Sequence, residues 1–290
     1  MGTFLKSAAR STKFDQCLTI LRLTIFACAS LALPIHSLAQ SSDTLWTETW
    51  EGDWFVDWHV DFGTWQVGMP TSGPGSAFKG QNCAATVLGG NYTEPTDTRL
   101  IRHATFVVPA VNEHPRLRFW HWFSFSAGDT GFVQIKAGNG NWETISEFYT
   151  ETGCGAWSYP SLDLSAYAGR SVQMSFYFKS RQIGFYSNVS TGWYIDEVAI
   201  VTRATVFNNP EGWEGGIGDW YADHGTWQVG APTSGPGSAH DGVNSAGTVL
   251  GGNYCEPVDS RLISPSFVIP NSNEHPRLRF WHWFSFSAGD

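Results

Sequence analysis

The clearest pattern in the chain is a strict alternation of side chains between Leu117 and Phe125. Taken in steps of two, Leu, Phe, His, Phe and Phe fall on one side, and Arg, Trp, Trp and Ser fall on the other. This period of two predicts a β-strand. Because aromatic rings occur on both sides, the strand is either covered on both faces or covered on one face while it presents Trp120 and Trp122 to solvent; coverage is the simpler interpretation.

The segment that contains this strand occurs twice. Residues 112–129 read NEHPRLRFWHWFSFSAGD, and the same letters return at residues 273–290. Other motifs repeat in the same order, including GTWQVG, PTSGPGSA and TVLGGNY, at a period of about 160 residues, whereas solenoid repeats have periods of about 20 to 50. The chain is therefore expected to contain a duplicated domain.

Similar short runs continue through the rest of the chain. Aromatic and β-branched residues are interrupted by Gly, Pro, Asn or Asp about every ten residues, and helix signals are nearly absent after residue 40. The composition, with 42% hydrophobic residues and 15 Trp among 290 residues, is ample for packed cores. These features predict an all-β fold, an antiparallel sandwich of two sheets.

The two copies differ in length. The first continues through strand-like runs such as VQMSFYFKS and ends with GWYIDEVAIV, whereas the second has no counterpart of residues 130–202. We therefore expect residues 40–204 to form a complete sandwich. Residues 205–290 are expected to be the front half of a truncated domain, with exposed strand edges and weaker order.

The N-terminus has the features of a secretory signal. Lys6, Arg10 and Lys13 precede an apolar run over residues 18–33, and small residues follow at Ser37–Ala39. Residues 1–39 are therefore predicted to be a signal peptide, and the protein to be secreted or at the cell surface. The run contains a charged residue and is followed by proline, which makes a membrane anchor the weaker interpretation. No other stretch is long enough to cross a bilayer.

The chain is acidic, with a formal net charge of −9. Removal of the predicted signal would take away more basic than acidic residues. This balance argues against nucleic acid and anionic membranes as partners, and it is compatible with cation binding or with simple solubility.

Three cysteines lie outside the predicted signal, namely Cys83, Cys154 and Cys255. A Cys83–Cys154 bridge is permitted in an exported protein, but Ser245 stands at the place of Cys83 in the second copy, so the fold does not require that bridge. No pair has the CxxC spacing that thiol redox or zinc-ribbon sites use.

Catalytic motifs are missing from the sequence. It contains neither HExxH nor GxSxG, and Cys154 lies near no histidine. His121 and His282 fall in the inward row of the alternating strand, where a hydrogen-bonded core histidine is the common case. The neighbouring acids Asp196 and Glu197 point to opposite sides of a strand. We therefore predict that this chain is not an enzyme.

Several motifs occur in a fixed order along the first copy: WEG at Trp50, GTWQVG at Gly63, GGNY at Gly89, DLSAYAG at Asp163 and GWYIDEV at Gly192. In this order they resemble the MAM-like domains of bacterial secreted proteins, such as immune-inhibitor-A-type metallopeptidases and bacillopeptidase-F-type proteases. The resemblance covers residues 45–202 and, as far as it extends, the tandem second copy. It implies a concanavalin-A-like jelly roll, with catalysis in a separate domain.

A calcium site is the most substantive site hypothesis. Hard cations bind carboxylate and carbonyl oxygens at strand ends and loops, where Glu51, Asp129 and Asp196 occur. The resemblance implies a cation between the opening Glu and an Asp of the last strand, with Glu211 as the opening Glu of the second copy. It also implies an acid after the Gly-Pro turn, which Asp241 provides in the second copy and Lys79 does not in the first. The alternative is that each acid accepts backbone hydrogen bonds.

Aromatic side chains suggest carbohydrate binding, because sandwich modules commonly hold sugars on aromatic faces. The candidates lie in or near predicted loops, where rings are less easily buried, and core packing is the alternative for each one. They are Trp54, Trp58, Tyr92, Trp157 and Tyr186.

Together these features favour an exported, non-catalytic module for recognition or adhesion, which binds carbohydrate or a cell-surface protein. Two alternatives remain at this point. The chain is an accessory fragment of a secreted metallo- or serine protease, or it is a structural spacer in a multidomain surface protein.

Overall fold

The computed structural model describes residues 44–290 except 151–154, 183–187, 224–226 and 257. The predicted signal peptide, Cys154 and Tyr186 lie outside the described residues. Within the described part the only helical elements are short 3-10 turns: η1 (Trp54–Val56), η2 (Val111–Glu113), η3 (Ser165–Tyr167) and η4 (Ser272–Glu274). No helix of that part is long and apolar enough to cross a membrane.

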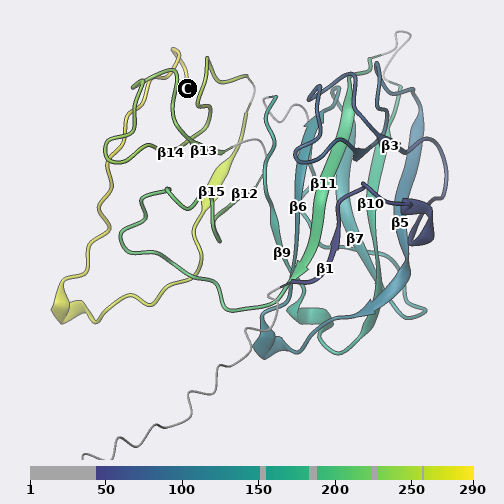
Figure 1. Ribbon diagram of the computed structural model, residues 1–290, viewed down its shortest axis with the longest axis horizontal. Helices are drawn as coiled ribbons and strands as arrows, with labels where there is room; N and C mark the ends of the chain where they lie inside the picture. The colour runs from purple at the N-terminus through teal and green to yellow at the C-terminus, as the bar shows by residue number, and fades with distance from the viewer. Residues whose placement is uncertain (1–43, 151–154, 183–187, 224–226, 257) are drawn as a thin grey trace, which may run out of the picture. The chain divides into compact units, whose positions relative to one another are not determined.

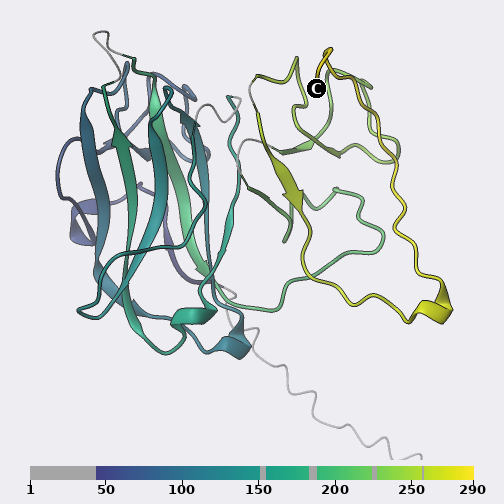
Figure 2. The same cartoon turned by 180° about the vertical axis from the view of Figure 1, so that it is seen from behind.

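The first copy forms two antiparallel sheets. In spatial order, the first sheet consists of β3 (Gln66–Gly68), β4 (Cys83–Ala85), β11 (Gly192–Val201), β6 (Arg116–Ser124) and β9 (Ser161–Asp163), and β1 (Thr44–Glu48) also pairs with β11. The second sheet consists of β2 (Trp58–Val60), β5 (Thr96–Val107), β10 (Ser171–Ser180), β7 (Thr130–Ala137) and β8 (Glu143–Thr144). The long strands of the two sheets run beside each other in Figures 1 and 2.

The chain crosses repeatedly between the two sheets. Strand β5 belongs to the second sheet, β6 to the first, β7 and β10 to the second, and β11 to the first. Most neighbours within a sheet are therefore distant in sequence, as in β11 beside β6 and β10 beside β5. This is a jelly-roll sandwich, and the predicted all-β fold class is confirmed.

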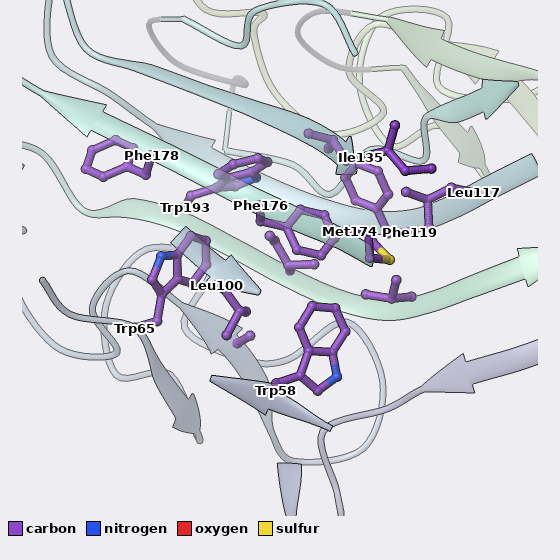
Figure 3. Close-up of a cluster of buried hydrophobic side chains, with 14 of the residues drawn as sticks. Trp58, Trp65, Leu100, Leu117, Phe119, Ile135, Met174, Phe176, Phe178 and Trp193 are labelled. Carbon is purple, nitrogen blue, oxygen red and sulfur yellow. The ribbon is translucent and has the colours of Figure 1, made fainter. Parts of the chain in front are cut away.

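Aromatic side chains fill the space between the sheets (Figure 3). The inward row of β6 contributes Leu117 and Phe119, both buried. Phe119 meets Phe176 of β10 edge-on at 5.1 Å between ring centroids, and Phe176 meets Trp193 of β11 at 5.7 Å. The alternation read from the sequence therefore does mark the face that enters the core.

The opposite face of β6 is covered as well. Trp122 is 7% exposed and packs with Tyr194 of β11. The ring of Trp120 stacks between Phe78 at 3.8 Å and Tyr159 at 4.6 Å, so both of its faces are occupied. The covered interpretation of this strand is confirmed, and Trp120 and Trp122 form no open aromatic platform.

The second copy pairs far fewer residues. Strand β12 (Tyr221–Asp223) pairs with β15 (Arg261–Ile263), and β13 (Gln228–Gly230) pairs with β14 (Ser245–Gly247). Residues 275–290 are exposed and form no strand, although their letters are those of β6 and its surroundings. Strand β6 lies between β11 and β9, and the described residues of the second copy contain no counterpart of β11. The same letters thus form a strand only where a partner strand is present.

Candidate binding site

A pocket of about 640 Å³ opens beside the start of β7 and the end of β10. Side chains on these strands alternate between the core and the outer face, and Phe178 is on the core side. Phe132 and Lys179 therefore lie on the outer face of the second sheet, where β7 and β10 are paired. The residues that line the pocket are Gly128, Thr130, Phe132, Phe148, Thr150, Lys179, Ser180 and Arg181.

Three aromatic rings form one side of this region. Phe132 meets Phe148 edge-on at 5.1 Å and contacts Tyr177 at 4.8 Å. Phe132 and Tyr177 are buried, whereas Phe148 is 56% exposed. Phe148 is therefore the ring of the pocket that is open to solvent, and it packs on the buried ring of Phe132.

The charged side chains of the pocket are basic. Lys179 and Arg181 are exposed, and the described lining residues include no Asp or Glu. The guanidinium of Arg99 lies 3.7 Å from the ring centroid of Tyr177. Arg99 also forms a salt bridge with Asp61 at 3.1 Å, so the cation that stacks on the Tyr177 ring is held in place. Lys179 is 3.6 Å from Asp97. Although the chain as a whole is acidic, the charged residues that line this pocket beside the exposed ring of Phe148 are the basic Lys179 and Arg181.

Sequence reasoning did not find this pocket. Outward placement of Tyr177 and Lys179 follows from the period of two in β10, whose inward residues include Met174 and Phe176. That signal was present in the sequence. No comparable pattern predicts the position of Phe148. This residue follows β8 and lies outside any strand, so its position depends on the tertiary contacts of that loop.

Two of the predicted aromatic candidates are buried, so the expectation that they offer rings to a ligand is wrong. Trp58 lies in the core beside Trp50 and Phe176. Tyr92 is buried against Phe178, and its hydroxyl donates a 2.5 Å hydrogen bond to Asp129. Both residues have turn residues as sequence neighbours, but their rings point inward and pack against other aromatic rings of the core.

The remaining aromatic candidates are intermediate cases. Trp54 stacks on Phe55 at 3.9 Å and packs partly against the core. Trp157 is half-buried and meets Phe78 edge-on at 6.0 Å. Neither residue lines the pocket.

The predicted calcium ligands Glu51 and Asp196 hold the same loop, residues 79–82. Glu51 accepts hydrogen bonds from the backbone N–H groups of Gln81 (2.7 Å) and Asn82 (2.8 Å), and these bonds lower its pKa. Asp196 is fully buried and accepts from the Lys79 N–H at 3.0 Å. Its burial raises the pKa to about 6. Both acids therefore accept hydrogen bonds from backbone donors of this loop, and calcium binding by them stays a prediction.

Asp129 lies elsewhere in the fold. It is buried and accepts from the Tyr92 hydroxyl and, at 3.0 Å, from the backbone N–H of Arg181. Burial raises its pKa. Asp129 thus anchors the end of β10 next to the pocket.

The structure corrects the equivalence that was assigned to Glu211. Glu214 corresponds to Glu51, because it accepts from the backbone N–H groups of Val243 (2.8 Å) and Asn244 (2.9 Å). Glu211 accepts from the indole of Trp220 at 3.3 Å instead. The error arose because a Glu-Gly pair occurs at both positions of the second copy, whereas the full motif WEG of Trp50 returns only at Trp213.

The last predicted ligand, Asp241, is exposed. In the part of the chain that the structure describes, no three His, Cys, Asp or Glu side chains come together as a metal-binding group.

Cys83 is free and buried, so the predicted Cys83–Cys154 bridge is wrong. It packs with Ala85, Trp122 and Tyr194 on the outer side of the first sheet. Burial, helped by the nearby charge of Asp196, raises the pKa of its thiol to about 12. Cys255, in contrast, is disulfide-bonded.

His121 is the hydrogen-bonded core histidine that the alternation predicts. It is buried, and its Nδ1 accepts from the Trp193 indole at 3.3 Å. Burial lowers its pKa to about 3. His282 was expected in the same inward row but is exposed, because the described second copy has no sheet facing it.

Comparison of sequences finds one kind of relative. No protein-family model matches the chain. Bacillopeptidase F from Bacillus subtilis (strain 168) is 30% identical over 141 residues, which is 48% of this chain and 9% of that protein. The chain therefore spans less than a tenth of the length of the relative, and membership of the MAM-like family stays an interpretation.

Comparison of structures finds carbohydrate-binding modules. The CBM22-1 xylan-binding domain from Paenibacillus barcinonensis Xyn10C is 17% identical, with a TM-score of 0.36 over 56% of this chain and 95% of that one. TmCBM61, solved with β-1,4-galactotriose, is 15% identical, with a TM-score of 0.35 over 50% of this chain and 88% of that one. Likenesses this low say nothing of what this chain binds.

Proposed function

We propose that the sandwich of residues 44–201 is a non-catalytic carbohydrate-recognition module of an exported protein. The observation that carries this proposal is the exposed ring of Phe148 beside the basic side chains of Lys179 and Arg181, in a pocket of about 640 Å³. A cavity of that size is in the range of small-ligand sites, which extend from about 300 to 1,000 Å³.

The chemistry of the pocket matches a sugar. The apolar face of a sugar ring stacks on an aromatic ring, and its hydroxyl groups take hydrogen bonds from a polar rim. Thr130 and Thr150 supply hydroxyl groups in the lining. The two cationic groups favour a saccharide that carries carboxylate or sulfate groups, because charge-assisted hydrogen bonds are stronger than neutral ones.

Binding to an array of neutral and acidic oligosaccharides tests the proposal. The full chain is expected to bind acidic members, and Phe148→Ala and Lys179→Met are each expected to weaken binding by about tenfold, or roughly 1.4 kcal/mol. Phe55→Ala is the matched control, since Phe55 is also an exposed phenylalanine but lies outside the pocket. Absence of saccharide binding, or equal affinity of wild type and Phe148→Ala, would refute the proposal.

A second candidate function is that of an accessory module beside a protease domain. The 30% identity to part of Bacillopeptidase F favours it. A protein ligand would then replace the saccharide. In that case the array shows no binding, while the immobilised chain retains a protease domain supplied in trans.

Calcium binding at Glu51 and Asp196 is a separate proposal. Both side chains contact the loop of residues 79–82, and calcium takes carboxylate oxygens together with backbone carbonyl oxygens of loops as ligands. A cation would also offset the cost of burying the Asp196 carboxylate, whose pKa is raised to about 6.

A further inference from the structure

The carboxylate of Asp219, in the segment that follows the first sandwich, is only 7% exposed. Arg203 binds it with both terminal nitrogens, Nη1 to Oδ2 at 2.5 Å and Nη2 to Oδ1 at 2.8 Å. The backbone N–H of Val206 donates to Oδ2 at 2.8 Å. These bonds and the surrounding guanidinium groups outweigh burial, and the pKa of Asp219 is lowered.

Two arginines of β6 complete the surroundings of this carboxylate. Nη2 of Arg116 and Nη1 of Arg118 each lie 3.9 Å from Oδ1 of Asp219. Arg118 also donates to the backbone carbonyls of Gly218 and Trp220, both at 3.0 Å. Both arginines are buried on the outer side of the first sheet. The segment around Asp219 therefore supplies acceptors and a negative charge to the terminal nitrogens of guanidinium groups that belong to the sandwich.

The balance of charge makes Asp219 a necessary counter-ion. Burial lowers the pKa of Arg118 to about 10, and the positive charges of Arg116 and Arg203 act in the same direction. Without the carboxylate, the buried guanidinium groups of Arg116 and Arg118 would face the partly exposed Arg203 with no counter-ion between them, which is unfavourable.

The internal duplication shows what distinguishes Asp219. Trp58 and Trp220 bind equivalent glutamates, so the preceding residues Asp57 and Asp219 correspond. Asp57 pairs with Arg102 of its own sheet at 3.0 Å. The position of Arg102, three residues after Arg99, is taken in the second copy by Ser264, three residues after Arg261. Loss of that arginine leaves Asp219 available to the arginines of β6.

We propose that the outer face of β6 is a docking surface for the start of the second copy, residues 203–220, and that Asp219 fixes this segment to Arg116 and Arg118. The partner that binds this surface is thus the following repeat, in which Ser264 stands at the position of Arg102. This interaction joins successive repeats of one chain and is independent of the ligand proposed for the pocket.

Tryptic cleavage after Arg203 in the purified full chain tests the proposal. Asp219→Asn keeps the cleavage site and removes the counter-ion, and it is expected to speed cleavage by about tenfold, since cleavage tracks the open population. Asp57→Asn is the matched control in the first copy and is expected to leave this rate unchanged. An unchanged rate in Asp219→Asn, or an equal acceleration in both variants, overturns the proposal.

A variant on the sandwich side separates docking from a purely local loop. Arg118→Met removes a receptor group but not the Arg203–Asp219 pair, and docking predicts faster cleavage in this variant too. Should it fail to fold, as judged by near-ultraviolet circular dichroism, Arg118→Lys serves the same purpose because it loses the forked contact to the two carbonyls. Acceleration in Asp219→Asn with none in the Arg118 variant shows that Asp219 only closes its own loop, and the docking proposal then fails.

Discussion

The indole N–H of Trp58 donates to the carboxylate of Glu48 across 3.1 Å. The same carboxylate accepts the backbone N–H of Trp50 at 2.9 Å. In the second copy Glu211 binds the indole of Trp220 and the backbone of Trp213 in the same way. The pair is thus a repeated structural feature, in which a partly buried acid accepts from an indole that is fully buried at Trp58 and half-buried at Trp220.

Substitution of either partner is expected to destabilise the sandwich. Glu48→Ala leaves the indole N–H unsatisfied and should cost about 1–3 kcal/mol. Trp58→Ala empties a core position and should cost about 3–5 kcal/mol. Chemical denaturation followed by tryptophan fluorescence measures both. Phe55→Ala, at a residue that is 67% exposed, is the control and should change stability little. A Glu48→Ala protein as stable as wild type would contradict the role assigned to the pair.

Burial of His121 predicts loss of stability in acid. Its pKa is lowered to about 3 in the folded protein, whereas the unfolded chain binds a proton at about 6.5. Below pH 6.5 the unfolded state therefore binds more protons, so stability falls as the pH falls towards 3. From pH 6.5 to pH 4 this residue alone should account for about 3 kcal/mol.

Unfolding free energies at pH 7, 5 and 4 check this, with His121→Gln as the test variant and the exposed His114→Gln as the control. The His121 variant is expected to be less stable at pH 7 and to show a shallower pH dependence. The same slope in both variants would mean that other groups dominate the acid sensitivity.

Chelation tests the proposed calcium ion. If calcium links Glu51 and Asp196 to the loop of residues 79–82, then EDTA lowers the melting temperature of the chain and added calcium restores it. Asp196→Asn should abolish the difference between the two conditions. Glu214→Gln, which alters the corresponding acid of the second copy, is the control and should retain it. A melting temperature that EDTA does not change would contradict the proposed calcium ion.

The identical letters of the two copies show how far sequence patterns reach. The period of two marks a strand at Leu117–Phe125, and the structure has one there. The same letters from Leu278 to Phe286 form no strand, because backbone donors and acceptors of a strand need neighbours. For the same reason His121 is a core residue and His282 is not.

Site residues show the same division. The sequence marks Glu51 and Asp196 as acids at unusual places, and both do hold the loop of residues 79–82. A Glu-Gly pair does not by itself show that Glu214 rather than Glu211 repeats this role; only the longer motif WEG, at Trp50 and again at Trp213, does so. Nor does the sequence predict that Phe148 lies at the rim of a pocket. The lining residues are distant in sequence and meet only because β7 pairs with β10.

By itself the sequence determined the class of fold, the duplication and the inward row of β6, because alternation is a local property of an extended backbone. Tertiary structure alone decided that Trp58 and Tyr92 are core residues, that Cys83 is free and that Asp219 meets the arginines of β6. These outcomes depend on strands and segments distant along the chain, and their approach is set by which surfaces can be buried together.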